Sequence, residues 1–199
     1  LGIYYVKEMA TDAHYILNNT KYPVAFEYGG QDIAKVEIKV NNGEKIENEL
    51  IYGSVSGIKK DENGEALSGA VIGLFASSDT EFTKDKALMT TISAEDGSFS
   101  FANIPYGTWC VREIEQPTGF VLNENVFDIV ISQDKEVVKV EIINEFVRGN
   151  ITLTKVDEEY PDNKLTGAEF EVYKDINENG EIDEVDELMG NLEEVEIGI

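Results

Sequence analysis

The sequence predicts an all-β protein made of antiparallel β-sandwich modules in tandem, and three observations support this fold class. Short stretches of alternating apolar and polar residues, bounded by turns rich in Gly, Asn and Pro, follow one another along the chain. No amphipathic helix of useful length appears between them. A long segment is also repeated, because GSVSGIKKDENGEALSGA at 53–70 returns as GNITLTKVDEEYPDNKLTGA at 149–168.

The spacing of the repeat matches the size of one β-sandwich domain. Asn48 and Lys59 recur as Asn144 and Lys155, and each pair is separated by 96 positions. A β-sandwich of the immunoglobulin class needs about 100 residues. The repeat is therefore a better guide to the number of domains than the chain length of 199 residues.

Three unequal parts follow from this spacing. A further similarity relates YYVKE at 4–8 to WCVRE at 109–113. We expect the C-terminal part of a module at 1–52, one complete module at 53–148, and the N-terminal part of a further module at 149–199.

Alternation and turn residues predict the strands in chain order. In the first part, strands are expected at 3–8, 22–28, 34–40 and 45–50. In the complete module, strands are expected at 54–59, 70–76, 87–93, 98–102, 107–114, 125–131 and 136–144, with a polar loop at 77–86. In the last part, we expect a repeat of the first strand, a second strand at 168–173 and a short helix over the acidic run 181–187.

The composition excludes several classes of partner. The 40 acidic and 16 basic residues give a formal net charge of −24, which repels nucleic acid and anionic lipid and favours cation binding. No apolar run reaches membrane-spanning length. The single cysteine, Cys110, rules out an internal disulfide, so a small secreted domain of this kind needs another means of stabilisation.

Three polar residues of the complete module fall on faces that alternation predicts to be buried. Lys59, Glu113 and Asn144 each share the apolar face of a different strand. A lysine on a buried face is unusual, because desolvation of an ammonium group is costly. One interpretation is a buried ion pair beside a hydrogen-bonded amide, although such a pair often adds little net stability.

Chemistry among the three residues is the other interpretation. Burial disfavours charge, so a buried lysine favours the neutral, nucleophilic amine and a buried carboxyl group favours its protonated form. A protonated carboxyl group can hydrogen-bond the oxygen of the Asn144 amide, polarise its carbonyl group and hand a proton to departing ammonia. The product is an isopeptide bond between the side chains of Lys59 and Asn144.

Three motifs in this order resemble the Cna-B type domains of Gram-positive surface adhesins and pilins: VSGIKKDENGEALSGA, YGTWCVREIEQPTGF and VEIINE. The resemblance implies a prealbumin- or transthyretin-like, inverse immunoglobulin-like sandwich. It also implies an autocatalytic isopeptide bond from Lys59 to Asn144, with Glu113 as the catalytic residue. Gly57 departs from the family pattern, in which a branched residue is usual.

The flanking parts carry counterparts of these residues. Glu8 and Asn48 match the acid and the amide in the first part, and Lys155 matches the nucleophile in the last part. Neither part contains a full set of three within its own residues.

An acidic loop in the last part resembles the calcium loop of an EF-hand. Oxygen-bearing residues fall at the first, third, fifth, seventh and twelfth positions of this loop, namely Asp175, Asn177, Asn179, Glu181 and Asp186. The twelfth position holds Asp where the EF-hand has Glu, which weakens bidentate closure around the ion. The alternative interpretation is an Asn-Gly turn in a very acidic chain.

We expect the protein to be a structural stalk or pilin-like repeat of a cell-wall-anchored, extracellular bacterial surface protein, and not an enzyme. The alternative is an adhesive binding module that contacts a host or extracellular ligand directly, and a third hypothesis is an accessory domain of a secreted enzyme. Expected partners are neighbouring modules, a host or extracellular-matrix protein, and other copies in head-to-tail self-association, with no nucleic acid and no membrane. No cofactor is required, and calcium is the one ion expected.

Overall fold

The computed structural model describes residues 1–33 and 35–193, and the described residues are dominated by β-strands. The chain divides into two compact units, Leu1–Val147 and Arg148–Ile199. None of the described residues form a helix with the length and apolar character needed to cross a membrane.

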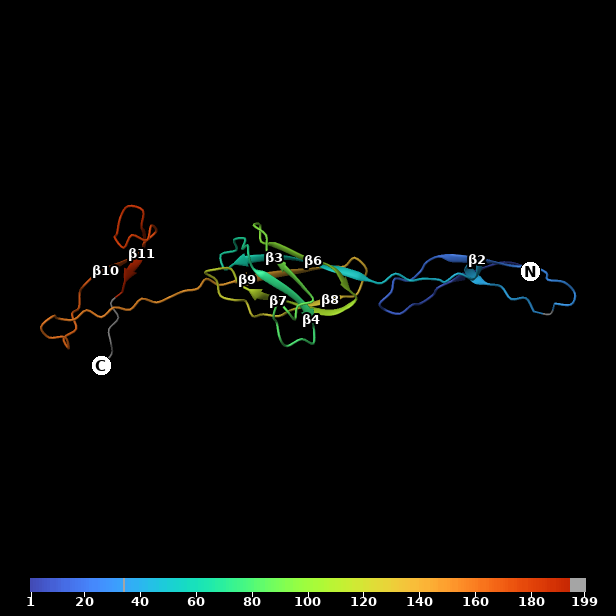
Figure 1. The fold of residues 1–199 in the computed structure, drawn as a ribbon, viewed down its shortest axis with the longest axis horizontal. Coiled ribbons are helices and arrows are strands. Elements are labelled where there is room, and N and C mark those ends of the chain that lie inside the picture. Colours follow the sequence, from blue (N-terminus) through green and yellow to red (C-terminus); the bar gives the residue numbers. More distant parts are fainter. Residues whose placement is uncertain (34, 194–199) are drawn as a thin grey trace. The chain divides into compact units, whose positions relative to one another are not determined.

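The strands of the first unit are β1 (Gly2–Lys7), β2 (Lys21–Phe26), β3 (Tyr52–Asp61), β4 (Val71–Ala76), β5 (Met89–Ile92), β6 (Ser98–Pro105), β7 (Gly107–Glu115), β8 (Phe127–Ile131) and β9 (Val137–Asn144), with a single 3-10 turn η1 at Val40–Gly43. The second unit contains β10 (Phe170–Lys174) and β11 (Glu187–Leu192). Figure 1 shows these elements along the chain.

Two sheets form the middle domain. One has the order β6-β3-β9 and the other β5-β4-β7-β8. All pairs are antiparallel except β3 with β9, which is parallel. The seven strands predicted for residues 53–148 are all present, so the all-β fold class is confirmed, but the parallel β3–β9 pair departs from the predicted antiparallel pairing.

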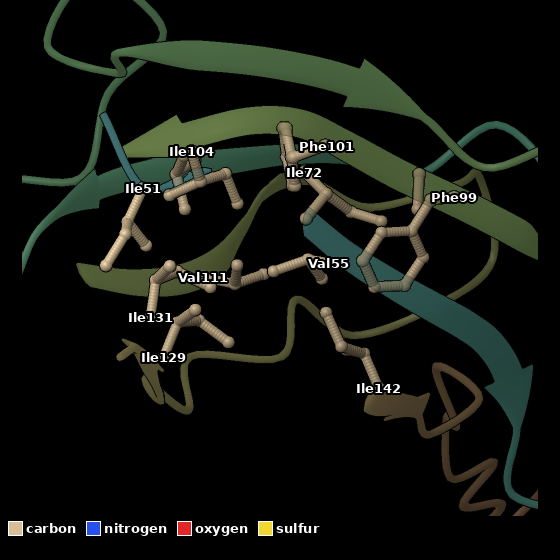
Figure 2. Close-up of a cluster of buried hydrophobic side chains, with 12 residues drawn as sticks. Ile51, Val55, Ile72, Phe99, Phe101, Ile104, Val111, Ile129, Ile131 and Ile142 are labelled. Atoms are coloured by element: carbon tan, nitrogen blue, oxygen red, sulfur yellow. The ribbon is translucent and has the colours of Figure 1, made fainter. Parts of the chain in front are cut away.

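The inner faces of the two sheets form one apolar core (Figure 2). Its buried members are Ile51, Val55, Ala70, Ile72, Leu74, Phe99, Phe101, Ile104, Val111, Ile129, Ile131 and Ile142. Most of them alternate along their strands with exposed residues, as a sheet with one packed face requires. The core therefore places the inward side chains of β3, β7 and β9 away from water.

Gly57 leaves room in this core for an aromatic ring. It lies on the buried face of β3, and a Cβ atom built at this position would collide with the ring of Phe99 on the paired strand β6. The departure from the family pattern at Gly57 is thus explained, because Phe99 fills the space that a branched side chain would occupy.

The outer face of the four-stranded sheet is also covered. Phe75 is fully buried, and the ring of Phe82 packs against it edge to face at 5.1 Å, with the guanidinium group of Arg112 4.7 Å from the Phe82 ring. Cys110 is paired with Phe75 on the neighbouring strand and is a free, buried thiol. The stretch 77–86 is a loop, as predicted, and it shields this face.

Strands β1 and β2 form a hairpin that repeats a hairpin of the middle domain. Gly2 pairs with Phe26 as Gly107 pairs with Ile131, and the offset of 105 positions holds for five consecutive pairs of β1–β2 and β7–β8. The two hairpins therefore have the same register, which the similarity of YYVKE and WCVRE had only suggested.

Two strands predicted for the first part are wrong. Residues 35–39 form no strand and Ala34 lies outside the described residues, while 45–50 is extended with one isolated bridge from Leu50 to Tyr15. In the middle domain the equivalent strand β9 is paired only with β3. Among the described residues 1–33 and 35–50, no strand corresponds to β3, so segment 45–50 has no parallel partner with which to form a ladder.

The second unit departs from prediction in the same way. The repeat of the first strand, at 151–155, is not a strand, because it has no neighbouring strand to pair with. The predicted strand at 168–173 is present as β10. The short helix predicted at 181–187 is wrong, since these residues form a turn that leads into β11, which pairs with β10.

The fit between Gly57 and Phe99 gives a first prediction. Gly57→Val should lower the free energy of unfolding of the middle domain by about 1–3 kcal/mol, because the added methyl groups overlap the Phe99 ring. Urea denaturation measures the loss. Ser56→Val, on the exposed side of the same strand, is the control and should change it by less than about 0.5 kcal/mol.

The double variant Gly57→Val with Phe99→Val distinguishes two explanations of the loss. One is steric overlap with the Phe99 ring, and the other is that β3 tolerates no side chain at position 57. Removal of the ring makes room for the valine, so the combined loss should be smaller than the sum of the two single losses. Additive losses would contradict this explanation of Gly57.

Candidate functional site

Three strands bring Lys59, Glu113 and Asn144 together in the middle domain. Lys59 lies on β3, Glu113 on β7 and Asn144 at the end of β9, and their exposed fractions are 0%, 1% and 1%. The inward orientation predicted from alternation is therefore confirmed for all three. Lys60, the next residue, points to the other face, where its Nζ atom lies 2.6 Å from Glu141.

The three side chains form one connected set of contacts. The Nζ atom of Lys59 donates to Oδ1 of Asn144, lies 3.4 Å from the backbone oxygen of Ile142, and is 3.6 Å from Oε1 of Glu113. The Nδ2 atom of Asn144 donates to the same Oε1 atom of Glu113 at 2.9 Å. One carboxylate oxygen is thus adjacent to both the amine and the amide nitrogen.

Burial alters the charge preference of the lysine. Desolvation lowers the pKa of Lys59, and the negative charge and hydrogen bond of Glu113 oppose this effect without cancelling it. A lowered pKa increases the fraction of neutral amine at a given pH. The neutral amine is the nucleophilic form, and it lies against the amide group that it would attack.

The position of Glu113 differs from the expectation in one respect. The sequence predicts a hydrogen bond from the Glu113 carboxyl group to the oxygen of the Asn144 amide, whereas in the structure the carboxylate accepts from the amide nitrogen. In this position the Glu113 carboxylate accepts a hydrogen bond from Nδ2 of Asn144, the nitrogen that would leave as ammonia. Proton transfer between the two nitrogens is therefore the role that the geometry favours for Glu113.

A fourth residue, Asn123, holds Glu113 in place, and sequence reasoning missed it. Its backbone N–H donates to Oε2 of Glu113 at 2.7 Å, and its Nδ2 atom donates to the backbone oxygen of Ile143 at 2.6 Å. Asn123 thereby links the carboxylate to the chain just before Asn144. Both oxygens of Glu113 have a donor from the protein.

The first part contains a corresponding arrangement around Glu8 and Asn48. The Nδ2 atom of Asn48 lies 3.0 and 2.9 Å from the two carboxylate oxygens of Glu8, and it also contacts Oγ1 of Thr11 and the backbone oxygen of Ile16. The backbone N–H of Asn18 donates to Oε2 of Glu8 at 2.6 Å. The structure therefore brings the two predicted residues together, and both are partly buried.

Asn18 repeats the contacts of Asn123. Its Nδ2 atom donates to the backbone oxygen of Glu47, the residue before Asn48, as that of Asn123 donates to Ile143. Each of the two asparagines lies ten positions after the glutamate that its backbone N–H contacts. The side-chain oxygen of each asparagine also accepts a hydrogen bond from the backbone N–H two positions later. The available signal was a repeated Leu-Asn pair, at 17–18 and 122–123, in similar positions of the two hairpins.

Lys155 has no buried environment, but the turn that follows it repeats the middle domain. The backbone oxygen of Lys155 accepts from the N–H of Leu165 at 2.9 Å, as that of Lys59 accepts from Leu67 at 3.0 Å. The side chain of Lys155 is exposed, with its Nζ atom 5.9 Å from the centre of the Phe170 ring.

The acidic loop is closed by its own hydrogen bonds. Asp175 accepts from the N–H groups of Asn179 and Gly180, while the Nδ2 atoms of Asn177 and Asn179 both donate to Asp183. A calcium ion would require both amide groups to turn their oxygen atoms toward it.

Within residues 1–33 and 35–193, no group of three or more His, Cys, Asp or Glu side chains is arranged to hold a metal ion. The described carboxylates of the loop therefore do not converge by themselves. The calcium site at Asp175, Asn177, Asn179, Glu181 and Asp186 remains a prediction.

The middle domain matches a known family. Residues 53–146 match the family model described as the SpaA prealbumin-like fold domain. This part of the chain is therefore similar to the SpaA prealbumin-like fold domain, in agreement with the resemblance seen in the sequence. No curated protein sequence matches the chain significantly.

Several solved structures are similar to this chain at low sequence identity. The chain is 23% identical to the Bacillus anthracis TIE protein, with a TM-score of 0.57 over 83% of this chain and 32% of that one, so it spans about a third of that structure. A C-terminal fragment of the pilus adhesin SpaC from Lactobacillus rhamnosus GG gives 17% identity and a TM-score of 0.47, covering 76% and 79% of the two chains. BcpA, the major pilin subunit of Bacillus cereus, gives 22% and 0.44, covering 71% and 41%.

The acidic loop gives a second prediction. Calcium should bind the full chain with a measurable heat in titration calorimetry, and Asp175→Ala should abolish this heat because it removes the residue at the first ligand position. Asp162→Ala, in another acidic stretch of the same unit, is the matched control and should leave the heat unchanged. No heat in the unaltered chain would show that the loop is only a turn.

Proposed function

We propose that the chain is a structural, pilin-like repeat segment of a cell-wall-anchored bacterial surface protein, stabilised by an autocatalytic isopeptide bond between Lys59 and Asn144. The buried contact of the Lys59 amine with the Asn144 amide, with Glu113 adjacent to both, is the observation that carries this proposal. A covalent link between the first and last strands resists force and proteases in a domain that has no disulfide.

The reaction needs only these side chains. The neutral Nζ of Lys59 attacks Cγ of Asn144, forming the Nζ–Cγ bond, and the Cγ–Nδ2 bond then breaks. Glu113 takes one proton from the attacking nitrogen and transfers it to Nδ2, which departs as ammonia. The domain core holds the reacting groups in contact, so proximity replaces the turnover of a separate enzyme.

Matched hydrogen bonds on both sides of the middle domain support a tandem arrangement. Residues 1–50 repeat the β7–β8 register and the asparagine contacts around the acid, and residues 149–165 repeat the turn after the lysine. The repeated hairpin and the repeated turn occur in the same order as in the middle domain and are spaced by about one domain length. This spacing supports an extended stalk built of similar modules. A very acidic surface keeps such a stalk soluble outside the cell.

The bond gives a third prediction. After denaturation, the purified chain should weigh one ammonia less than its sequence requires, because Nδ2 of Asn144 is lost. Glu113→Ala should restore the full mass by removing the proton carrier. Lys60→Ala is the control, since Lys60 lies on the other face of the same strand and its loss should leave the reduced mass unchanged. A full mass for the unaltered chain refutes the proposal.

The bond should also stabilise the domain. It would join residues 85 positions apart, and the chain-entropy model of cross-links assigns about 4–5 kcal/mol to a loop of this length. The free energy of unfolding measured in urea should therefore be lower for Glu113→Ala than for the unaltered chain by an amount of at least this order.

The lowered pKa of Lys59 gives a fourth prediction. Chain that is kept unfolded and unreacted should lose ammonia on refolding at a rate that rises with pH, because only the neutral amine attacks. Since burial lowers the pKa of Lys59, the rate should level off below the ordinary lysine value of 10.5. Mass spectrometry of quenched samples measures this rate. A half-maximal rate at the ordinary lysine value would contradict the assigned environment.

A further inference from the structure

Residues 119–123, which lie between β7 and β8 in the chain, form a strap along the end of β9. Two backbone hydrogen bonds of 2.8 Å attach the strap, from the N–H of Val147 to the oxygen of Gly119 and from the N–H of Val121 to the oxygen of Glu145. Both bonds fit one antiparallel ladder, in which bonded pairs recur every two residues on each segment. The ladder therefore leads toward the reacting end of β9.

Asn123 departs from this ladder in a specific way. The next bond of the ladder would run from the backbone N–H of Asn123 to the backbone oxygen of Ile143. The Nδ2 atom of the Asn123 side chain takes that place instead and donates to the same oxygen at 2.6 Å. The backbone N–H is thereby released from the ladder, and it donates to Oε2 of Glu113 at 2.7 Å.

The same exchange occurs a second time in the chain, beside Glu8. The N–H of Ile16 donates to the backbone oxygen of Glu49 at 2.8 Å, as a ladder bond. At the next position, Nδ2 of Asn18 donates to the backbone oxygen of Glu47 at 3.1 Å. The N–H of Asn18 donates to Oε2 of Glu8 at 2.6 Å. Two separate segments thus use the side chain of an asparagine to turn its backbone N–H toward a glutamate.

This exchange decides where the carboxylate of Glu113 points. The last torsion of a glutamate side chain has a broad profile, so its own rotamer preference does not orient the two oxygens. While the N–H of Asn123 holds Oε2, the other oxygen, Oε1, lies 2.9 Å from Nδ2 of Asn144 and 3.6 Å from Nζ of Lys59. Return of that N–H to the ladder would remove the bond that holds Oε2.

We propose that Asn123 is a positioning residue for the isopeptide reaction. Its side-chain amide substitutes for its backbone N–H in the ladder, so that the backbone N–H fixes the Glu113 carboxylate beside the two reacting nitrogens. This inference rests on the proposed function, because it assigns a role in the same reaction. Asn123 exchanges no proton with the reacting groups and acts only through Glu113.

The chemistry of the side chain explains why this position holds asparagine. A carboxamide donates through Nδ2 and accepts through Oδ1. At Asn123 the nitrogen donates to Ile143, and the oxygen accepts from the N–H of Asn125 at 2.9 Å. Ionised aspartate keeps the shape and the acceptor but has no donor, and alanine has neither.

Variants of Asn123 in the full chain test the role through the rate of the reaction. Chain kept unfolded and unreacted is refolded, and the loss of ammonia is followed by mass spectrometry. Asn123→Asp should slow this loss by about 10–100-fold, because the carboxylate is no longer held in place. Asn123→Ala should slow it similarly without an added charge. Asn125→Ala is the control, since it removes an exposed side chain of the same segment and keeps the N–H that Asn123 accepts.

A measurement of folding separates positioning from a merely structural role. The same variants are combined with Lys59→Met, which cannot form the bond, and the folded fraction is measured by urea denaturation. The folded fraction under the conditions of the rate measurement should stay close to that of Lys59→Met alone. A fall in the folded fraction that matches the fall in rate overturns the inference.

The backbone amide proton of residue 123 gives a spectroscopic readout of the exchange. A proton donated to a carboxylate at short distance is in a strong hydrogen bond and resonates downfield. In Asn123→Ala with Lys59→Met this resonance should move upfield, after correction for the change of residue in the unfolded chain, because the N–H returns to the oxygen of Ile143. A purely structural role leaves the resonance downfield, and that result overturns the inference.

The mass of the unaltered chain distinguishes failure of this inference from failure of the proposed function. Loss of one ammonia in the unaltered chain, with an unchanged rate in both Asn123 variants, overturns only the positioning role. A full mass for the unaltered chain overturns the proposed function and this role together.

Discussion

The structure depends on a lysine amine buried against an asparagine amide between two sheets. An ammonium group without exposure to water is costly, and a nearby carboxylate repays this cost only in part. The domain core nevertheless surrounds Lys59 completely. Conversion of the amine into an amide, which does not ionise, would remove this cost permanently, and it would give a physical reason for a lysine at a position where an apolar residue would pack well.

Strand pairing is the second constraint, and it explains which parts of the chain form regular structure. The strand β9 pairs with β3 along its length, whereas the equivalent segment 44–49 has the same alternation but no parallel strand paired with it among the described residues. Segment 151–155 repeats the sequence pattern of β3, with Lys155 at the position of Lys59, but it is not paired with another strand. Both segments have the composition of strands, and tertiary context decides whether a ladder forms.

The sequence predicted the middle domain well because two independent signals agreed there. Alternation placed Lys59, Glu113 and Asn144 on inward faces, and turn residues separated the strands. Asn123 was missed because its role depends on a backbone N–H and on a contact with Ile143, neither of which has a periodic signal. The helix expected at 181–187 was inferred from acidic composition alone, and pairing of β11 with β10 overrode it.

The central claim is the covalent link between the first and last strands of the middle domain. Tandem mass spectrometry of a protease digest of the unaltered, denatured chain tests it most directly. If the bond forms, the digest should contain one branched peptide in which Lys59 and Asn144 are joined with the loss of ammonia. Recovery of the Lys59 peptide and the Asn144 peptide only as separate, unmodified species would contradict it.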